Sequence, residues 1–224
     1  MTNKRTRTKK EWESILAKIK YGCIPDEGRK AIYQQGYRRM VALRKLGVWK
    51  TGDKILDIGC GNGRLAIPLA NKRVRYTGFE IIPECIVFCR KAFKPWNDRF
   101  NFRYVDVLNP FYNPNGTLDP TNFMFDLSNK SFDCILCSSL FTHLGTPQTC
   151  QNYLNEVQRL LKPGGMAYVT WFRSPPNKVH YKADRTVLRE AEIISLLKGF
   201  EVKHTEGGLT QKWHDQWRMV LRKW

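Results

Sequence analysis

One run near residue 55 constrains the fold more than any other part of this chain. A short apolar segment, Lys54–Ile58, is followed by glycines at every second position: Gly59, Gly61 and Gly63. An apolar run before closely spaced glycines predicts a buried strand and a tight turn, and the residues from Arg64 onward predict that a helix begins there. Because glycine adopts positive φ and has no Cβ, a ligand could approach this backbone closely and meet the N–H groups of the helix start.

The spacing of the glycines distinguishes between the known kinds of glycine-rich turn. A dinucleotide-binding fingerprint has the form Gly-x-Gly-x-x-Gly, whereas the spacing here is Gly59-x-Gly61-x-Gly63. A P-loop needs Gly-Lys-Ser/Thr, which this turn lacks. Together with Asp57, the pattern Asp-x-Gly-x-Gly-x-Gly resembles motif I of the class I S-adenosylmethionine-dependent methyltransferases. The alternative is an ordinary strand–helix turn without a ligand.

The next predicted strand, residues 75–80, also ends in an acid. Glu80 lies 17 residues after Gly63 (80 − 63), close to the spacing at which doubly wound folds place the carboxylate that accepts from a ribose hydroxyl. Ile81 and Ile82 follow, where they would lie against an adenine ring. A strand-end carboxylate by itself is more often solvated, but the preceding glycine turn favours a ribose-binding role for Glu80.

The resemblance implies a fold and a methyl donor. The fold is α/β, a Rossmann-like seven-stranded, mostly parallel sheet with helices on both faces, and the donor is S-adenosyl-L-methionine, which leaves as S-adenosyl-L-homocysteine. The third predicted strand, residues 102–107, puts Asp106 where this family has an acid near the adenine amino group, although Asp106 could instead start a turn. The turn at residues 161–165, Leu-Lys-Pro-Gly-Gly, is a further likeness. The residues expected to bind the donor are Asp57, Gly59, Cys60, Gly61, Gly63, Glu80, Ile81, Asp106, Val107 and Ser138.

A fourth strand is predicted at residues 132–140, and it is apolar almost throughout, as in a strand buried on both faces. In a doubly wound sheet its carboxyl end meets the same crevice as the glycine turn. We therefore expect residues 138–143 to line the place where methyl donor and acceptor meet. His143 is the candidate catalytic base for a hydroxyl acceptor, or else a hydrogen-bonded structural residue; an amine acceptor would need no strong base.

The segment after the third strand favours one kind of acceptor over another. Residues 109–112, Asn-Pro-Phe-Tyr, look like the Asn-Pro-Pro-Tyr box of amino-methylating DNA enzymes. That box follows the fourth strand in those enzymes, so residues 109–129 are more simply an inserted loop at the mouth of the site. Residues 61–66, 112–116 and 139–144 are similar to a broad bacterial and viral methyltransferase group, many members of which are suspected of modifying glycans or small molecules.

The charge of the chain favours a different acceptor. The formal net charge is +18, and residues 1–50 hold 14 Lys/Arg against 4 Asp/Glu, so +10, while the other 174 residues hold +8. We expect a basic arm with a helical extension at 1–50, disordered over residues 1–10, and a donor-binding domain at 51–224. Such charge favours an anionic partner such as nucleic acid, or is a solubility tail. Two further alternatives are a nucleic-acid-binding module that keeps the fold without the activity, and an enzyme that performs other chemistry on the same cofactor.

The remaining expectations concern location and cysteine chemistry. No run approaches 18 apolar residues, and no apolar segment follows the basic N-terminus, so neither a membrane span nor a secretory signal is expected and the cytoplasm is the default location. The seven cysteines are spread over predicted core elements without ligand spacing, which favours reduced packing residues and no metal site. Residues 173–184, with Arg173, Lys178, His180 and Lys182, are expected to clamp the acceptor, and the last two strands to form a hairpin-like edge.

Overall fold

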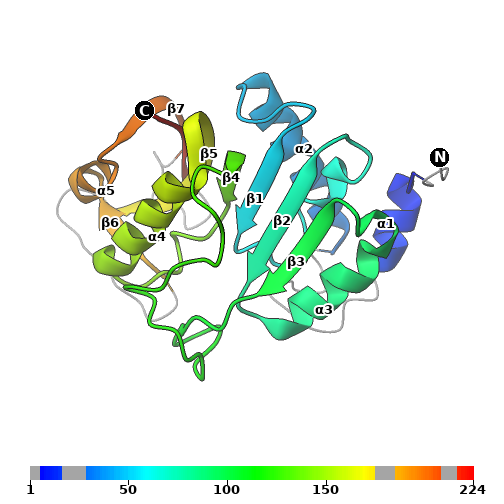
Figure 1. The fold of residues 1–224 in the computed structure, drawn as a ribbon, viewed down its shortest axis with the longest axis horizontal. Coiled ribbons are helices and arrows are strands. Elements are labelled where there is room, and N and C mark those ends of the chain that lie inside the picture. The colour runs from blue at the N-terminus through cyan, green and yellow to red at the C-terminus, as the bar shows by residue number, and fades with distance from the viewer. Residues whose placement is uncertain (1–5, 17–28, 175–184, 208–215) are drawn as a thin grey trace. The chain divides into compact units, whose positions relative to one another are not determined.

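The computed structural model describes residues 6–16, 29–174, 185–207 and 216–224 (Figure 1). The chain forms two compact units, Met1–Val105 and Asp106–Trp224. The N-terminal helices therefore belong to the same unit as the glycine turn. Residues 175–184, which include the predicted acceptor clamp apart from Arg173, lie outside the described residues.

The first unit contains a parallel three-stranded sheet in the order β3-β2-β1. The predicted strands at 54–58 and 75–80 are confirmed, whereas the third strand starts two residues and ends three residues earlier than predicted, so that it ends before Asp106. Most side chains of β1 and β2 are buried, and the Tyr76 ring of β2 stacks on the Phe100 ring of β3. The bounds are β1 Lys54–Ile58, β2 Arg75–Glu80 and β3 Phe100–Tyr104.

Three α-helices accompany this sheet. α1 begins at Lys9, within the arm expected to be disordered, because Thr8 and Glu11 form a reciprocal cap: Thr8 N–H donates to Glu11 Oε2 (2.7 Å) and Glu11 N–H to Thr8 Oγ1 (3.3 Å). Trp12 then packs between Phe93 and Trp96, which seats α1 on the unit. The bounds are α1 Lys9–Leu16, α2 Arg29–Lys45 and α3 Pro83–Ala92, with short 3₁₀ helices η2 Ile67–Leu69 and η3 Lys94–Trp96.

The α-helix predicted to begin at Arg64 is absent, and this prediction was wrong. Residues 61–66 form successive turns, and only the three-residue helix η2 follows. Gly61 and Gly63 both have positive φ, so these two residues belong to the turn and not to a right-handed helix. Pro68 then lies at the start of η2 and supplies no N–H to extend a helical ladder through that position.

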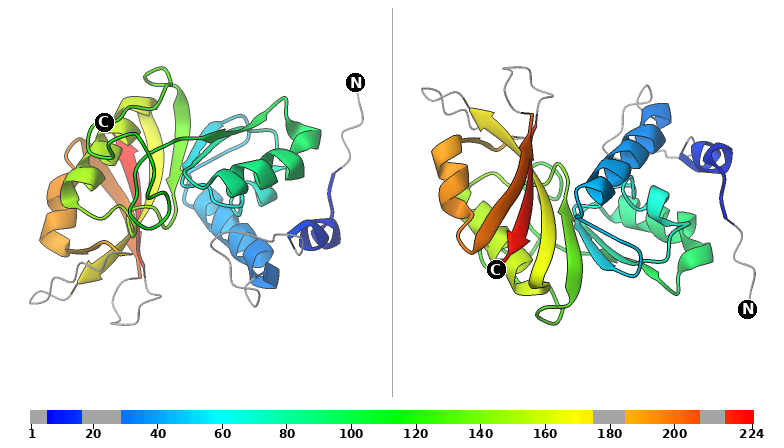
Figure 2. Two further views of the ribbon diagram at one scale, coloured as in Figure 1. Left: turned by 90° about the horizontal axis from the view of Figure 1, so that it is seen from below. Right: turned by 90° about the horizontal axis from the view of Figure 1, so that it is seen from above.

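The second unit is a mixed sheet with helices α4 and α5 lying together on one face (Figure 2). β4 and β6 run parallel to β5, whereas β8 runs antiparallel between β5 and β7. The predicted hairpin-like edge of the last two strands is confirmed. The bounds are β4 Phe132–Cys137, β5 Leu161–Ser174, β6 Val187–Arg189, β7 Phe200–Glu206, β8 Trp217–Lys223, α4 Pro147–Leu160 and α5 Glu190–Leu196.

Hydrogen bonds near their first residues fix the starts of both described helices of this unit. α4 begins at Pro147, where Thr146 caps it by accepting from Thr149 N–H (3.1 Å), and it ends at Leu160, within residues 155–161 where the sequence predicts that a helix closes. The predicted helix 186–197 starts instead with strand β6, and α5 begins only after Arg189, whose N–H donates to Glu192 Oε2 (2.8 Å). With β6, the described residues contain eight strands, one more than the seven expected.

The cores of both units are apolar and include the cysteines. The side chains of β4 from Cys134 to Cys137 are 0% exposed, as expected for a strand covered on both faces. The six described cysteines are buried thiols, in agreement with their expected packing role. Among the described helices, none combines the length and apolar character needed to cross a bilayer.

Candidate functional site

The glycine turn follows β1 directly and is fastened to the end of β2. Gly59, Gly61 and Gly63 have φ of 76°, 52° and 74°, so all three occupy the left-handed region that suits glycine. The N–H groups of Gly59 and Cys60 both donate to the carbonyl of Phe79, each at 2.9 Å. This pairing holds the start of the turn against the residue before Glu80.

The glycines of the turn differ in what surrounds them. A Cβ at Gly63 would lie 3.0 Å from Phe93 and 3.3 Å from Cys89 Sγ, so a side chain there would disturb the core. A Cβ at Gly61 would meet nothing within 4 Å. Gly61 therefore borders open space in the middle of the turn, where a ligand could approach the backbone closely.

Glu80 ends β2 with its carboxylate turned onto the glycine turn. Its Oε2 accepts from Gly61 N–H (2.8 Å), and its Oε1 accepts from Ile81 N–H (2.7 Å) and Ile82 N–H (3.1 Å). The residue is 8% exposed, and burial raises the pKa of the carboxyl group, while the three backbone donors oppose that rise. A carboxylate offers about four acceptor positions, so roughly one remains for a further donor.

Asp57 lies on β1 beneath the turn and is only partly satisfied. Its Oδ2 accepts from the Tyr76 hydroxyl (2.6 Å), whereas its Oδ1 is buried without a hydrogen-bond partner among the described residues. Burial raises the pKa of Asp57 to about 7, against the opposing effects of the Tyr76 hydrogen bond and the Arg64 guanidinium. An unsatisfied buried carboxylate oxygen is costly, so a cationic donor at this position would be favourable.

Tyr76 and Gly78 are partners of the turn that the sequence reasoning did not identify. Asp57 pairs with Gly78 in the β1–β2 register and Ile55 with Tyr76, so Asp57 and Tyr76 are diagonal neighbours on one face of the sheet. Strand alternation from the predicted register could have found this contact. A Cβ at Gly78 would lie 2.8 Å from Cys60 Sγ, which explains why glycine stands there.

The Cys60 side chain packs against Gly78 of β2. The side chain is 5% exposed and fills the space over Gly78, and its Sγ also lies 3.7 Å from the Gly61 carbonyl. The neighbouring Cys89 and burial raise the pKa of the Cys60 thiol well above its usual value. The thiol is therefore protonated at neutral pH, and a contact with the donor would have to come from its backbone.

Helix α2 covers the other side of the turn at van der Waals distance. A Cβ at Gly36 would lie 2.1 Å from the carbonyl oxygen of Arg64, so only glycine allows the helix to approach the turn this closely. Within the turn, Asn62 is 5% exposed and its Oδ1 has no hydrogen-bond partner among the described residues. Gly36 and Asn62 are further members of the site that the sequence reasoning missed.

In the second unit, Asp106 organises the loop that follows it. Its Oδ2 accepts from Thr117 Oγ1 (2.7 Å) and Thr117 N–H (3.3 Å), and its Oδ1 accepts from Asn113 Nδ2 (3.1 Å). Val107 is 2% exposed and bridges to Leu118. Asp106 thus joins the two ends of the loop, and its contact with adenine stays a prediction.

The Asn-Pro-Phe-Tyr segment uses its asparagine for its own loop. Asn109 Oδ1 accepts from the N–H groups of Phe111 and Tyr112, both at 3.0 Å, and its Nδ2 donates to the His143 carbonyl (3.0 Å). In this arrangement the amide shapes an Asx turn. These contacts agree with the prediction that the segment is an inserted loop and not an amino-methylating box.

His143 lies in an aromatic cluster formed by that loop and β5. Its Nδ1 is 3.4 Å from the Tyr112 hydroxyl, and its ring packs edge-on against Tyr112 and Phe172. Near it, Ser139 has a positive φ of 60°, and its N–H donates to Thr170 Oγ1 (2.7 Å). Positive φ is rare for serine and marks a constrained backbone directly after Ser138.

The first unit thus brings together seven of the predicted residues: Asp57, Gly59, Cys60, Gly61, Gly63, Glu80 and Ile81. Asp106, Val107, Ser138 and His143 belong to the second unit, and their part in the site stays a prediction. Within the described ranges, no group of three or more His, Cys, Asp or Glu side chains could hold a metal ion.

Comparison of the sequence with known proteins shows to which family this chain belongs. Residues 56–167 match the model of the family described as "Methyltransferase domain". A demethylmenaquinone methyltransferase of Tropheryma whipplei is 30% identical over 142 residues, which is 63% of this chain and 51% of the relative, so the chain spans about half the length of that relative. A ubiquinone biosynthesis O-methyltransferase of Xanthomonas oryzae pv. oryzae is 23% identical over 191 residues, covering 76% and 72% of the two chains.

The fold extends beyond the matched segment. The crystal structure of magnesium protoporphyrin IX methyltransferase from Synechocystis, with SAH bound, aligns with a TM-score of 0.63 at 14% identity and covers 95% of this chain and 93% of its own. At that identity the likeness concerns the fold alone. The family match over half of the chain and the shared fold together establish that this protein belongs to the methyltransferase domain family and has its class I, Rossmann-like architecture.

Proposed function

We propose that this protein transfers a methyl group from S-adenosyl-L-methionine to an acceptor. The observation that carries the proposal is the buried Glu80 carboxylate, fixed against the glycine turn by Gly61, Ile81 and Ile82. A carboxylate at the end of the second strand is placed to accept from a ribose hydroxyl. Its remaining acceptor position suits one such hydroxyl.

The other groups of the turn fit the rest of the donor. The Asp57 Oδ1 without a partner would accept from the ammonium group of the donor's amino acid, which would also lower the raised pKa of Asp57. The open space at Gly61 would let the donor approach the protein backbone closely. When bound, S-adenosylmethionine would supply a methyl group on a positively charged sulfur; an acceptor lone pair would bond to the methyl carbon in line with the C–S bond, which breaks and leaves its electron pair on the neutral sulfur of S-adenosylhomocysteine.

On the acceptor side, we propose that Ser138 and His143 line the site, with Asp106 and Val107 beside the adenine. His143 would take the proton of a hydroxyl acceptor through its Nε2, provided that Nδ1 carries its proton toward the Tyr112 hydroxyl oxygen. A hydroxyl acceptor is consistent with the O-methyltransferase name of one relative and with an Asn109 that is already engaged in its loop. A cytoplasmic location is part of the same proposal.

Calorimetry with S-adenosylmethionine and with S-adenosylhomocysteine tests donor binding. Glu80→Gln keeps the size of the side chain, removes its charge, and should weaken binding about tenfold or more, because hydrogen bonds to charged groups contribute roughly 1.5–3 kcal/mol. The matched control is Glu84→Gln, an exposed acid on α3 four residues away, which should leave affinity unchanged. Equal affinity of the Glu80 variant and the wild type, with both folded by circular dichroism, would refute the proposed role.

The acceptor is tested separately with donor labelled in its methyl group. Hydroxyl-bearing small molecules, glycans and oligonucleotides would be offered in parallel, and product analysis would distinguish methyl transfer from other chemistry on the donor. His143→Gln should lower the rate on a hydroxyl acceptor by about 10²–10⁴-fold without changing donor affinity. A variant that keeps the wild-type rate would exclude His143 as the base.

A further inference from the structure

Exposed cations gather at the edge of the first unit where its strands begin. Lys54 and Arg75 are the first residues of β1 and β2 and are neighbours in register. Lys50 lies in the loop before β1, and Lys72 and Arg73 lie in the loop before β2. All five side chains are exposed, and we refer to them as the basal face.

The backbone beneath the basal face is well fixed. Gly52 N–H donates to the carbonyl of Arg73 (2.7 Å), which joins the two loops. The guanidinium of Arg99, half-buried at the start of β3, donates to the carbonyls of Ala70 and Lys72. Arg99 is therefore committed to holding the loop, and the exposed cations project from a rigid support.

The loops before β1 and β2 contain more cations than acids, and the exposed Asp98 in the loop before β3 interacts with Arg99. Residues 50–54 and 71–75 contain the five cations of the basal face and one acid, Asp53. Asp53 is 6% exposed, and its carboxylate accepts from the Lys50 N–H (2.8 Å) beneath the surface. The local excess of positive charge therefore faces solvent and would attract an anion.

The N-terminal arm continues the same surface. Asn71 Nδ2 donates to the carbonyl of Arg7 (3.1 Å), which places the start of α1 beside the loop that carries Lys72. The Arg7 guanidinium lies over the Trp12 ring at 5.0 Å, which anchors the arm, and Lys10 in the first turn of α1 is exposed. The two basic segments, far apart in sequence, thus adjoin on one unit.

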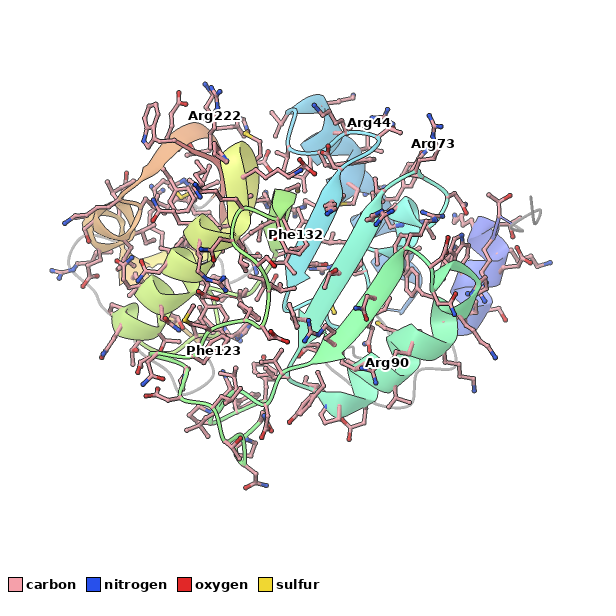
Figure 3. The ribbon with its side chains drawn as sticks, in the orientation of Figure 1. Arg44, Arg73, Arg90, Phe123, Phe132 and Arg222 are labelled. Atoms are coloured by element: carbon pink, nitrogen blue, oxygen red, sulfur yellow. The ribbon has the colours of Figure 1, made fainter. Side chains whose placement is uncertain are left out.

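The composition of this edge matches a polyphosphate chain better than a lipid surface. Its apolar side chains are directed inward: Val48, Trp49 and Val74 are 1%, 4% and 3% exposed. Near this edge the Leu46 side chain is 39% exposed, and one such side chain offers too little apolar surface for insertion into a membrane. Figure 3 shows Arg44 and Arg73 at this edge with their side chains directed outward, which extends the row of cations along it.

We propose that the basal face binds the phosphodiester backbone of a nucleic acid. The face lies at the amino ends of β1 and β2, whereas the glycine turn and Glu80 lie at their carboxyl ends. Five residues of β1 separate the two edges by about 16 Å at 3.3 Å per residue. A bound strand therefore leaves the proposed donor site open, and its binding does not depend on the proposed function.

The test measures binding by fluorescence anisotropy over a series of KCl concentrations. The probes are a labelled 20-nucleotide mixed-sequence RNA and the DNA of the same sequence, with vesicles of phosphatidylcholine alone or with phosphatidylserine as the competing anionic surface. The variant is Lys50→Gln, Lys72→Gln and Arg73→Gln combined, and the control is Lys130→Gln, Lys198→Gln and Arg222→Gln, exposed cations of the second unit. Both lower the formal net charge from +18 to +15 (18 − 3), so they differ only in position.

We expect the basal-face variant to bind either oligonucleotide about tenfold or more weakly at 100 mM KCl. Its slope of log K against log[KCl] should be shallower by about 2, since each lost contact to a single strand removes about 0.7. The control should keep the wild-type slope, and Glu80→Gln should keep wild-type oligonucleotide affinity even if it fails to bind the donor. RNA and DNA that bind equally indicate recognition of phosphate, whereas a preference for RNA indicates contacts to the 2′-hydroxyl.

Three results would overturn the proposal. Equal losses in the two triple variants would mean that overall charge, and not this face, binds the oligonucleotide. Binding to phosphatidylserine vesicles without oligonucleotide binding would assign the face to a membrane. A wild-type protein that binds neither probe at 100 mM KCl would leave the face without an anionic partner. If the triple variant unfolds, Arg73→Gln alone should still reduce the salt slope by about 0.7, and an unchanged slope would count against the face.

Discussion

The close approach of α2 to the glycine turn makes Gly36→Ala the most informative single substitution. The added Cβ would lie 2.1 Å from the Arg64 carbonyl oxygen, whereas real Cβ contacts are essentially never below 3.0 Å, so helix and turn must separate by about 0.9 Å (3.0 − 2.1). The Arg64 carbonyl oxygen belongs to the backbone, so it cannot avoid the added methyl group by a change of side-chain rotamer. The turn that would shift is the one that Glu80 and the proposed donor contact.

The expected magnitude comes from two opposing terms. Replacing glycine by alanine within a helix stabilises it by about 1 kcal/mol. Forcing a methyl group into a packed interface costs roughly 3 kcal/mol at the upper end of overpacking. The net loss of about 2 kcal/mol should lower Tm by roughly 4–8 °C for a chain of this size.

Thermal unfolding followed by circular dichroism measures this shift, and calorimetry with S-adenosylhomocysteine measures the accompanying change in the turn. The control is Gln35→Ala, at an exposed position of the same helix, which should leave Tm within about 1 °C. We expect Gly36→Ala to bind the ligand several-fold more weakly as well. A rise in Tm for Gly36→Ala would show that helix propensity dominates and that α2 does not press on the turn.

Two further predictions concern buried carboxylates. Burial raises the pKa of Asp57 to about 7 from 3.8, so between about pH 4 and 7 the folded protein holds this proton while the unfolded chain releases it. The free energy of unfolding should therefore fall as pH rises through this window, by an amount of order 4 kcal/mol at most. In urea titrations at several pH values, Asp57→Asn should reduce this pH dependence. A slope that persists unchanged in Asp57→Asn would assign it to other groups. Arg159→Ala would leave Glu156, which is 4% exposed, without the guanidinium that contacts it at 2.7 Å and that also holds the carbonyls of Phe125 and Leu127. We expect a loss of about 3 kcal/mol in urea unfolding and faster amide exchange over residues 123–129, and unchanged exchange there would refute this anchoring role.

β1 and β2 were predictable because each carries its own local signal. β1 and β2 are short apolar runs with defined ends, and both their bounds and the glycine turn between them follow from the sequence. Glu80 was found for the same reason, since a carboxylate that ends such a strand has a defined place in the fold. Its three backbone hydrogen bonds are made with residues adjacent to the predicted turn.

The features that escaped prediction depend on contacts between distant segments or on capping. α1 starts at a cap formed by Thr8 and Glu11, within residues whose charge pattern predicted disorder. The helix expected after the turn is interrupted because Pro68 has no N–H to donate to the Arg64 carbonyl. The role of Gly36 depends on its contact with the Arg64 carbonyl, a residue 28 positions away (64 − 36), and no local pattern reports such a contact.

Glu80 fixes the glycine turn after β1 through hydrogen bonds that form without any ligand. The conformational entropy lost in ordering that bend is thus incurred during folding and not during association, which favours tight binding by a rigid receptor. The same arrangement ties affinity to architecture, because a change at this carboxylate loosens the peptide groups around it as well as removing an acceptor. Selection for a different nucleoside would therefore have to act elsewhere in the chain, at positions that do not also maintain the bend.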